Sequence, residues 1–130
     1  MFNRKGALLS LSLLLTAPLA VAHHSTANFD QTKEQTITGV VSYFAFTNPH
    51  SYIDLEATAD PQSGKAEPYK VFAPGRVLLI RYDWLLPDLK AGDKVTITGA
   101  PDRKDPHFMY LKSITFASGK VWQRSQQIPE

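Results

Sequence analysis

The sequence lacks cysteine altogether, so none of its 130 residues can form a disulfide and the fold must rest on an apolar core. It also lacks a real surplus of one charge. Lys and Arg number 14 against 12 Asp and Glu, and two of the basic residues, Arg4 and Lys5, stand at the extreme N-terminus. Phosphate binding needs Lys and Arg concentrated on one face. The composition therefore argues against nucleic acid as a partner.

No apolar run is long enough to span a bilayer, which takes about 20 residues. The stretch "ALLSLSLLLTAPLAVA" follows two basic residues, is broken by Pro18, and ends in the small-x-small pattern of Ala20 and Ala22. These are the features of a cleavable secretory signal, which we place at residues 1–22. No cysteine follows for lipid attachment. We therefore expect a periplasmic or secreted protein without a stable membrane anchor after cleavage.

The rest of the chain has room for one domain. We predict an extended N-terminal arm at residues 23–35, pinned by Phe29, then a single β-barrel domain at 36–122 and a polar tail at 123–130.

Five segments rich in β-branched, aromatic or alternating apolar residues predict strands. They span residues 36–46, 51–58, 68–73, 94–100 and 108–117, with a final turn and short strand up to 122. Val77, Ile80, Arg81 and Trp84 lie at helical spacing between the third and fourth strands, and Pro87 ends that pattern. Gly39 predicts a bulge or sharp coil in the first strand.

This order of elements is typical of an all-β protein with one short helix, namely a small OB-fold-like, five-stranded Greek-key barrel. The alternative is an open antiparallel meander with a capping helix.

Several short motifs occur together: "HHS" directly after the signal, then "FD" at Phe29-Asp30, "TNPHS" at Thr47 to Ser51, Trp84, and "LKAGDKVTITGAP" at Leu89 to Pro101. In order and spacing they resemble domain of unknown function family 6152, an uncharacterised family of small exported bacterial proteins. The segment "APGRVLLIRYD" departs from that family in being more apolar than the Gly-rich stretch expected there. The resemblance implies export and a small β-barrel-like fold, and it implies no activity.

The four histidines, His23, His24, His50 and His107, are the candidate metal ligands. His50 lies between the first two predicted strands and His107 between the last two. In an OB-fold these loops border one ligand-binding face. An extended arm of about 12 residues reaches about 40 Å, which is enough to bring His23 and His24 to the same face.

Copper is the favoured metal because it prefers a planar set of nitrogen ligands. Cleavage after Ala22 frees the amine of His23, which can chelate Cu(II) together with its own imidazole. Cleavage after Ala20 leaves Val-Ala-His, a sequence suited to Cu(II) or Ni(II). The competing interpretation is structural: a polar start for His23 and His24, a turn cap for His50 and a solvated loop residue for His107.

We therefore predict an exported protein that is not an enzyme and that binds a transition metal, copper being favoured. The main alternative is a non-metal binding module for a small ligand, a glycan or an envelope protein, and a further one is a copper oxidase with an N-terminal histidine site. Ser25 and Ser51 adjoin histidines, but a catalytic triad needs an oriented base that adjacency does not supply. Asp54 and Glu56 are interpreted as a solvated strand face, and most aromatic residues as part of the barrel.

Overall fold

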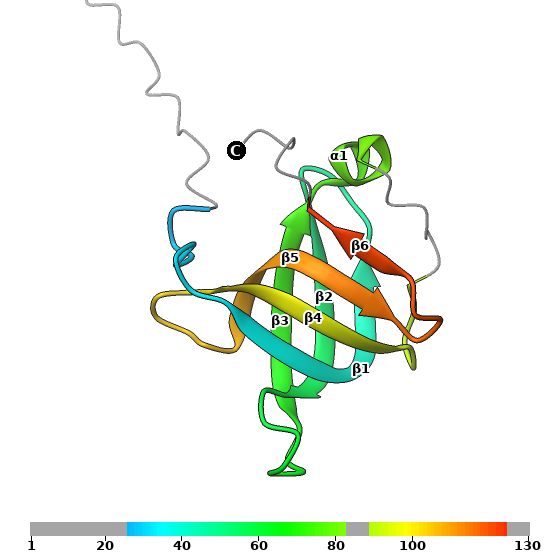
Figure 1. Ribbon diagram of the computed structural model, residues 1–130. Coiled ribbons are helices and arrows are strands. Elements are labelled where there is room, and N and C mark those ends of the chain that lie inside the picture. The colour runs from blue at the N-terminus through cyan, green and yellow to red at the C-terminus, as the bar shows by residue number, and fades with distance from the viewer. Residues whose placement is uncertain (1–25, 83–88, 125–130) are drawn as a thin grey trace, which may run out of the picture.

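The computed structural model describes residues 26–82 and 89–124 of the chain and contains six strands and one helix. Figure 1 shows them wrapped into a small barrel with the helix at one end. The elements are β1 (Gln35–Ala45), β2 (His50–Thr58), β3 (Glu67–Pro74), α1 (Arg76–Arg81), β4 (Lys94–Pro101), β5 (Phe108–Phe116) and β6 (Val121–Gln123).

The strand pairing closes the barrel. β1 pairs antiparallel with both β2 and β4, β2 pairs with β3, and β4 pairs with β5. A parallel pairing of Lys70–Phe72 in β3 with Phe108–Tyr110 in β5 joins the two ends. This order, with the helix between β3 and β4, confirms the OB-fold-like barrel. The open meander is wrong, because a meander has no β3–β5 pairing.

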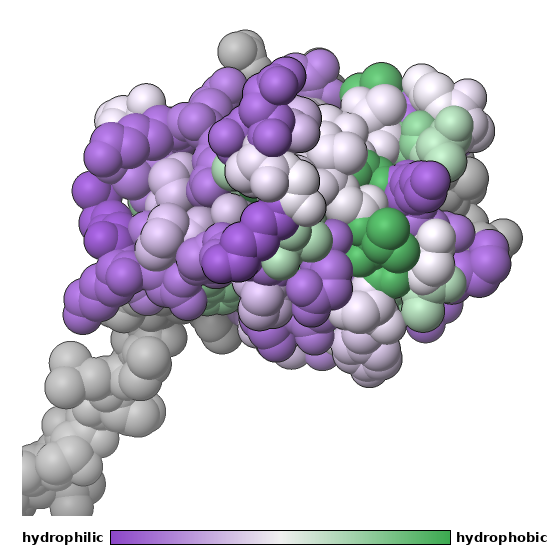
Figure 2. All heavy atoms as spheres, turned by 90° about the horizontal axis from the view of Figure 1, so that it is seen from below, coloured by the Kyte–Doolittle hydropathy of each residue, from purple (hydrophilic) through white to green (hydrophobic). Residues whose placement is uncertain are grey.

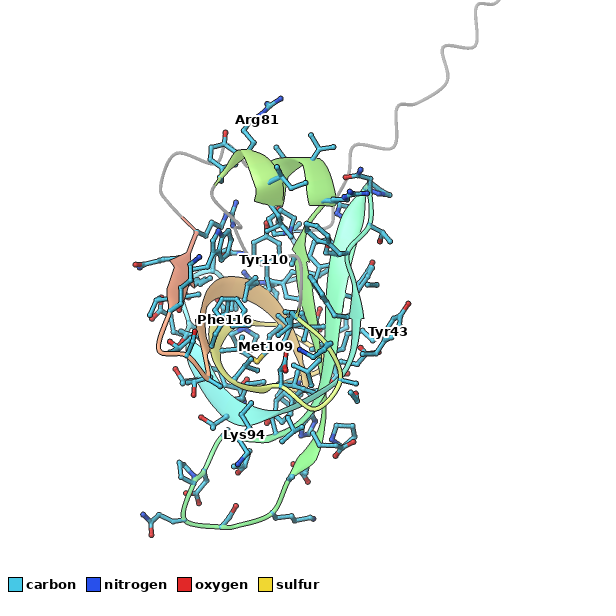
Figure 3. The ribbon with its side chains drawn as sticks, turned by 90° about the vertical axis from the view of Figure 1, so that its right-hand side faces the viewer. Tyr43, Arg81, Lys94, Met109, Tyr110 and Phe116 are labelled. Carbon is cyan, nitrogen blue, oxygen red and sulfur yellow. The ribbon has the colours of Figure 1, made fainter. Side chains whose placement is uncertain are left out.

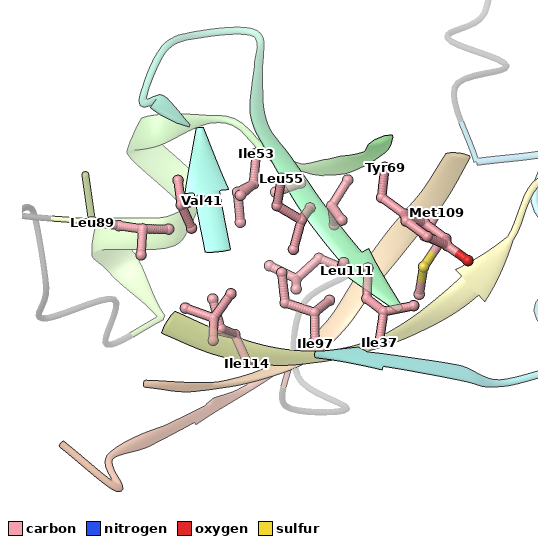
Figure 4. Packing of buried hydrophobic residues seen from close by; sticks show 14 of the residues in the cluster. Ile37, Val41, Ile53, Leu55, Tyr69, Leu89, Ile97, Met109, Leu111 and Ile114 are labelled. Carbon is pink, nitrogen blue, oxygen red and sulfur yellow. The ribbon is translucent and has the colours of Figure 1, made fainter. Parts of the chain in front are cut away.

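The interior is filled by alternate residues of each strand, as the pleat requires. Ile37 and Val41 of β1, Ile53 of β2, and Ile97 and Ile114 of β4 and β5 are fully or almost fully buried (Figure 4). The apolar residues of the alternation predicted in segments 51–58 and 94–100 therefore face the barrel interior. β6 adds Trp122, which is 5% exposed and whose Nε1–H donates to the carbonyl of Tyr82.

Gly39 serves close packing of two backbones instead of a bulge. A Cβ at this position would lie 2.1 Å from the carbonyl oxygen of Glu56 and 2.5 Å from Cα of Ala57. The register shift of β1 against β2 falls between Val41 and Tyr43, beyond the glycine. The bulge predicted at Gly39 therefore lies further along the strand.

The helix between β3 and β4 buries a residue other than those that its pattern marked. α1 ends at Arg81 and closes the barrel with Leu79, whereas Val77 and Ile80 are 56% and 53% exposed. The predicted continuation through Trp84 to Pro87 lies outside the described residues. No helix in the described part of the chain is both long and apolar enough to cross a membrane.

The N-terminal arm is attached to the outside of the barrel. Phe29 is 2% exposed, forms a bridge with Asp102, and packs its ring against Phe72, Phe108 and Tyr110. These residues, with Ala100, form a second apolar cluster separate from the barrel interior. The predicted anchoring role of Phe29 is confirmed.

Candidate functional site

The "TNPHS" motif forms a closed turn that also supports the helix. The Ser51 hydroxyl donates to the carbonyl of Thr47 at 3.2 Å, and the Thr47 hydroxyl donates to the carbonyl of His50 at 2.9 Å. The Val77 N–H donates to Asn48 Oδ1 at 3.1 Å, so Asn48 satisfies an N–H group at the start of α1. The position that faces this turn, Gly75, requires glycine, because a Cβ there would lie 2.4 Å from the Pro49 carbonyl oxygen.

The "FD" motif fastens the arm. Beside the buried Phe29, the Asp30 carboxylate accepts hydrogen bonds from the hydroxyl and the backbone N–H of Thr32 at 2.6 and 3.2 Å. Lys33 and Arg103 form ion pairs with the same carboxylate at 3.5 and 3.7 Å. The pKa of Asp30 is lowered from its usual value, mainly by the hydrogen bond from the Thr32 hydroxyl.

His50 is the first residue of β2 and its half-buried imidazole lies on the outside of the barrel. The ring packs against Phe72, with centroids 4.5 Å apart. Phe72 also contacts the Phe29 ring at 5.8 Å. The candidate ligand and the anchor of the arm thus meet on one aromatic residue.

His107 lies elsewhere, in the loop before β5. Its Nε2 is 3.0 Å from Glu67 Oε2, and its ring packs edge-on against Tyr69 at 4.7 Å. The hydrogen bond from His107 is the largest cause of the lowered pKa of Glu67. Burial is the main cause of the raised pKa of Tyr69.

The expected approach of His50 and His107 does not occur in this structure. His50 is paired with Pro74, whereas the His107 carbonyl accepts the N–H of Lys70, four positions earlier in β3. At about 3.3 Å per residue, that places them about 13 Å apart along β3, with one on each side of it. One metal ion cannot be held by both histidines at this distance.

His23 and His24 lie outside the described residues. Within the described ranges, no group of three or more His, Asp or Glu side chains is arranged to hold a metal ion.

A groove of about 440 Å³ lies over β2 and β3, a feature that sequence reasoning did not identify. The Asp54 carboxylate in it forms an ion pair through its buried Oδ1, which lies 3.3 Å from Lys70 Nζ but has no hydrogen-bond partner. The only available signal was the alternation of charged residues along both strands. The lining residues are Ser42, Asp54, Leu55, Glu56, Pro68, Tyr69, Lys70, Asp105, His107 and Phe108.

Two other candidates from the sequence were Ser51 and the aromatic residues. Ser51 is fully buried and bonded to Thr47, so its hydroxyl is unavailable as a nucleophile. The aromatic residues divide as expected: Phe72 and Tyr110 are buried, whereas Tyr43 is 60% exposed and points away from the barrel (Figure 3). Trp84 and Ser25 lie outside the described residues.

Comparison with solved structures finds similar chains at low sequence identity. One is a mitochondrial single-stranded DNA binding protein from S. cerevisiae, Rim1, with 12% identity, a TM-score of 0.49, and coverage of 65% of this chain and 93% of that one. Another is a ZRD-deleted mutant of TiaS in complex with agmatine, with 14% identity, a TM-score of 0.49, and coverage of 72% of this chain and 26% of that one. These likenesses are too distant to bear on function.

Among curated proteins, none matches this sequence. A family of unknown function, DUF6152, matches residues 11–108, which include all four histidines and the "HHS", "FD" and "TNPHS" motifs. The resemblance inferred from those motifs is thereby confirmed, and the chain belongs to the DUF6152 family.

Proposed function

We propose that this protein is exported, is not an enzyme, and binds a transition metal, copper being favoured, through His23, His24 and His50. The amine freed by signal cleavage would complete a nitrogen-rich ligand set of the kind that Cu(II) prefers. His107 is left out of this site because it lies on the other side of β3.

The contact of Phe72 with both Phe29 and His50 supports this proposal most directly. His24 is five residues before Phe29 in the chain, and five residues reach at most about 17 Å. Because Phe29 is fixed on the same ring that His50 contacts, the N-terminal histidines are tethered within reach of His50.

The structural roles of the other family motifs give further support. Phe29 and Asp30 fasten the arm, and Thr47, Asn48 and Ser51 close the turn and support α1. The half-buried His50 ring lies on the outside of the barrel and packs against Phe72, next to these motif residues.

The test is a Cu(II) titration of the exported protein, followed by electron paramagnetic resonance, after intact mass has established its first residue. His23→Ala and His50→Ala should each weaken binding at least tenfold and reduce the nitrogen hyperfine structure. His107→Ala is the matched control and should bind copper like the wild type. Wild-type affinity in His50→Ala, or an equal loss in His107→Ala, would reject the His50 site.

The groove over β2 and β3 favours a second candidate, a binding module for a small non-metal ligand. It occupies the face that OB-folds use for ligands and holds the ion pair of Lys70 with Asp54, whose buried Oδ1 lies 3.3 Å from the ammonium and accepts no hydrogen bond. An NMR titration with putrescine and, separately, glucose tests it in metal-free buffer. Saturable shifts at Asp54 and Lys70 that vanish in Asp54→Asn would support this candidate. No shift with either probe at millimolar concentration would count against binding of both ligand types.

A further inference from the structure

The surface of α1 is unusually apolar for an exposed helix. Val77, Leu78 and Ile80 are 56%, 36% and 53% exposed, and they account for three of the six exposed large hydrophobic residues in the described part of the chain. Leu79 alone is fully buried. A helix that only closes the barrel needs one apolar stripe, with polar residues on its outer side. The barrel therefore does not account for these three side chains.

The helix is held firmly in this exposed position. The Arg76 N–H donates to the carbonyl of Thr47 at 2.9 Å, and Asn48 accepts the N–H of Val77. At the other end, the carbonyl of Tyr82 accepts the indole N–H of Trp122 at 2.9 Å. Figure 1 shows α1 projecting from one end of the barrel, and Figure 2 shows that the opposite end is mainly hydrophilic. The two ends thus differ in character.

The described residues of the helix carry two basic side chains and no acidic one, and Asp83 follows directly in the sequence. Arg76 and Arg81 are exposed at its two ends, and Figure 3 shows Arg81 directed away from the barrel. Neither "GRVLLIRY" (75–82) nor the supporting turn "FTNPH" (46–50) contains a carboxylate. The Arg76 guanidinium lies 5.6 Å from the centre of the Phe46 ring.

We propose that the α1 end of the barrel docks on the surface of an anionic phospholipid membrane. Val77, Leu78 and Ile80 would enter the boundary between headgroups and acyl chains, while Arg76 and Arg81 pair with lipid phosphates. Reversible surface binding of this kind needs both apolar area and basic charge, and α1 supplies both. This attachment is peripheral, and it is independent of the proposed metal site.

The experiment is co-sedimentation of the purified exported protein with vesicles of phosphatidylglycerol and phosphatidylethanolamine, compared with pure phosphatidylcholine vesicles. Binding should be at least tenfold stronger to the anionic vesicles and should fall as salt is raised. The double variant Val77→Ser/Ile80→Ser and the double variant Arg76→Gln/Arg81→Gln should each lose at least tenfold. Val121→Ser, which alters an equally exposed valine (56%) on β6, is the matched control and should bind like the wild type.

Circular dichroism of each variant establishes that the barrel is folded before binding is compared. Wild-type binding by the Val77→Ser/Ile80→Ser variant would overturn the proposal, as would equal binding to both vesicle types. Sedimentation velocity without lipid tests whether the same face binds a second copy of the chain instead. A dimer that dissociates in Val77→Ser/Ile80→Ser, together with no vesicle binding, would assign α1 to a second copy of the chain and overturn membrane docking.

Discussion

At the scale of single residues, Gly39 shows how little space separates β1 from β2. The absent side chain lets the β1 backbone approach Glu56 and Ala57 more closely than any Cβ would allow. The sequence marked this glycine as exceptional within a strand, but its reason lies in a residue 18 positions away, Ala57.

We predict that Gly39→Ala destabilises the protein by about 3 kcal/mol, because the new methyl group overlaps backbone atoms that cannot easily move. Denaturant unfolding followed by circular dichroism measures this change. Gly64→Ala is the control: Gly64 has φ +64° with open space around it, so only the backbone conformation costs free energy, about 1 kcal/mol. Equal losses in the two variants would show that β1 and β2 tolerate the added atom.

The Asp30 carboxylate gives a prediction about pH. Its pKa is lowered mainly by the Thr32 hydroxyl, with smaller contributions from Arg103 and Lys33. A carboxylate whose pKa is lowered on folding stabilises the protein above its unfolded-state pKa, and this contribution is lost as pH falls through the folded-state pKa. Thr32→Val should raise the pKa of Asp30 towards 3.8, as seen in an NMR titration of the carboxyl carbon. Lys33→Gln should raise it less, and a larger effect of Lys33→Gln would contradict the assigned cause.

At the scale of elements, the arm and α1 are the two segments whose positions depend on contacts outside the strand ladder. The arm is held by Phe29, Asp30 and the Lys112 ammonium, which donates to the carbonyls of Gln31 and Lys33. The helix is held by Asn48 and by Leu79 in the barrel end. These contacts fix the described start of the arm at Phe29 and the exposed residues Val77, Leu78 and Ile80 of α1 at defined locations on the barrel.

Phe29→Ala should lower stability by about 3 kcal/mol and weaken copper binding together, since the ring is buried among three aromatic partners and anchors the arm. Thermal unfolding and the Cu(II) titration measure the two effects. Tyr43→Ala, at a residue 60% exposed, should change stability by less than about 0.5 kcal/mol and leave copper binding as it is. Wild-type copper affinity in Phe29→Ala would show that anchoring of the arm by Phe29 does not contribute to copper binding.

At the scale of the whole molecule, the β3–β5 pairing makes one closed unit of the described strands. The arm cluster shares Phe72 of β3 and Tyr110 of β5 with that closing pair, so it lies across the seam of the barrel. The residues that anchor the arm are therefore residues that close the barrel.

We predict one cooperative unfolding transition for the arm and the barrel, because the arm packs on strands that cannot separate without opening the barrel. Far-ultraviolet circular dichroism, tryptophan fluorescence and NMR signals of the Phe29 ring should give the same midpoint in urea. Loss of the Phe29 signals at clearly lower urea would show that the arm unfolds on its own.

Much of the fold was predictable from local pattern. The alternation in 51–58 and 94–100, the turns at glycine and proline, and the order of strands and helix identify the barrel, because a pleated strand with one buried face leaves a period of two in the sequence. The helix was located less well. Its exposed side is as apolar as its buried side, so periodicity could not tell which residue faces the core.

The candidate site was only partly predictable, because it depends on strand register and on contacts distant in sequence. The residues alone predicted a secretory leader, a cysteine-free β-barrel, membership of one family and four candidate metal-ligating histidines, and of these the barrel and the family are confirmed. Only the tertiary structure decided that His50 meets Phe29 on Phe72, while His107 lies with Glu67 across β3. The reason is physical: barrel closure sets which loops meet, and a difference of four positions in a strand separates two side chains by about 13 Å.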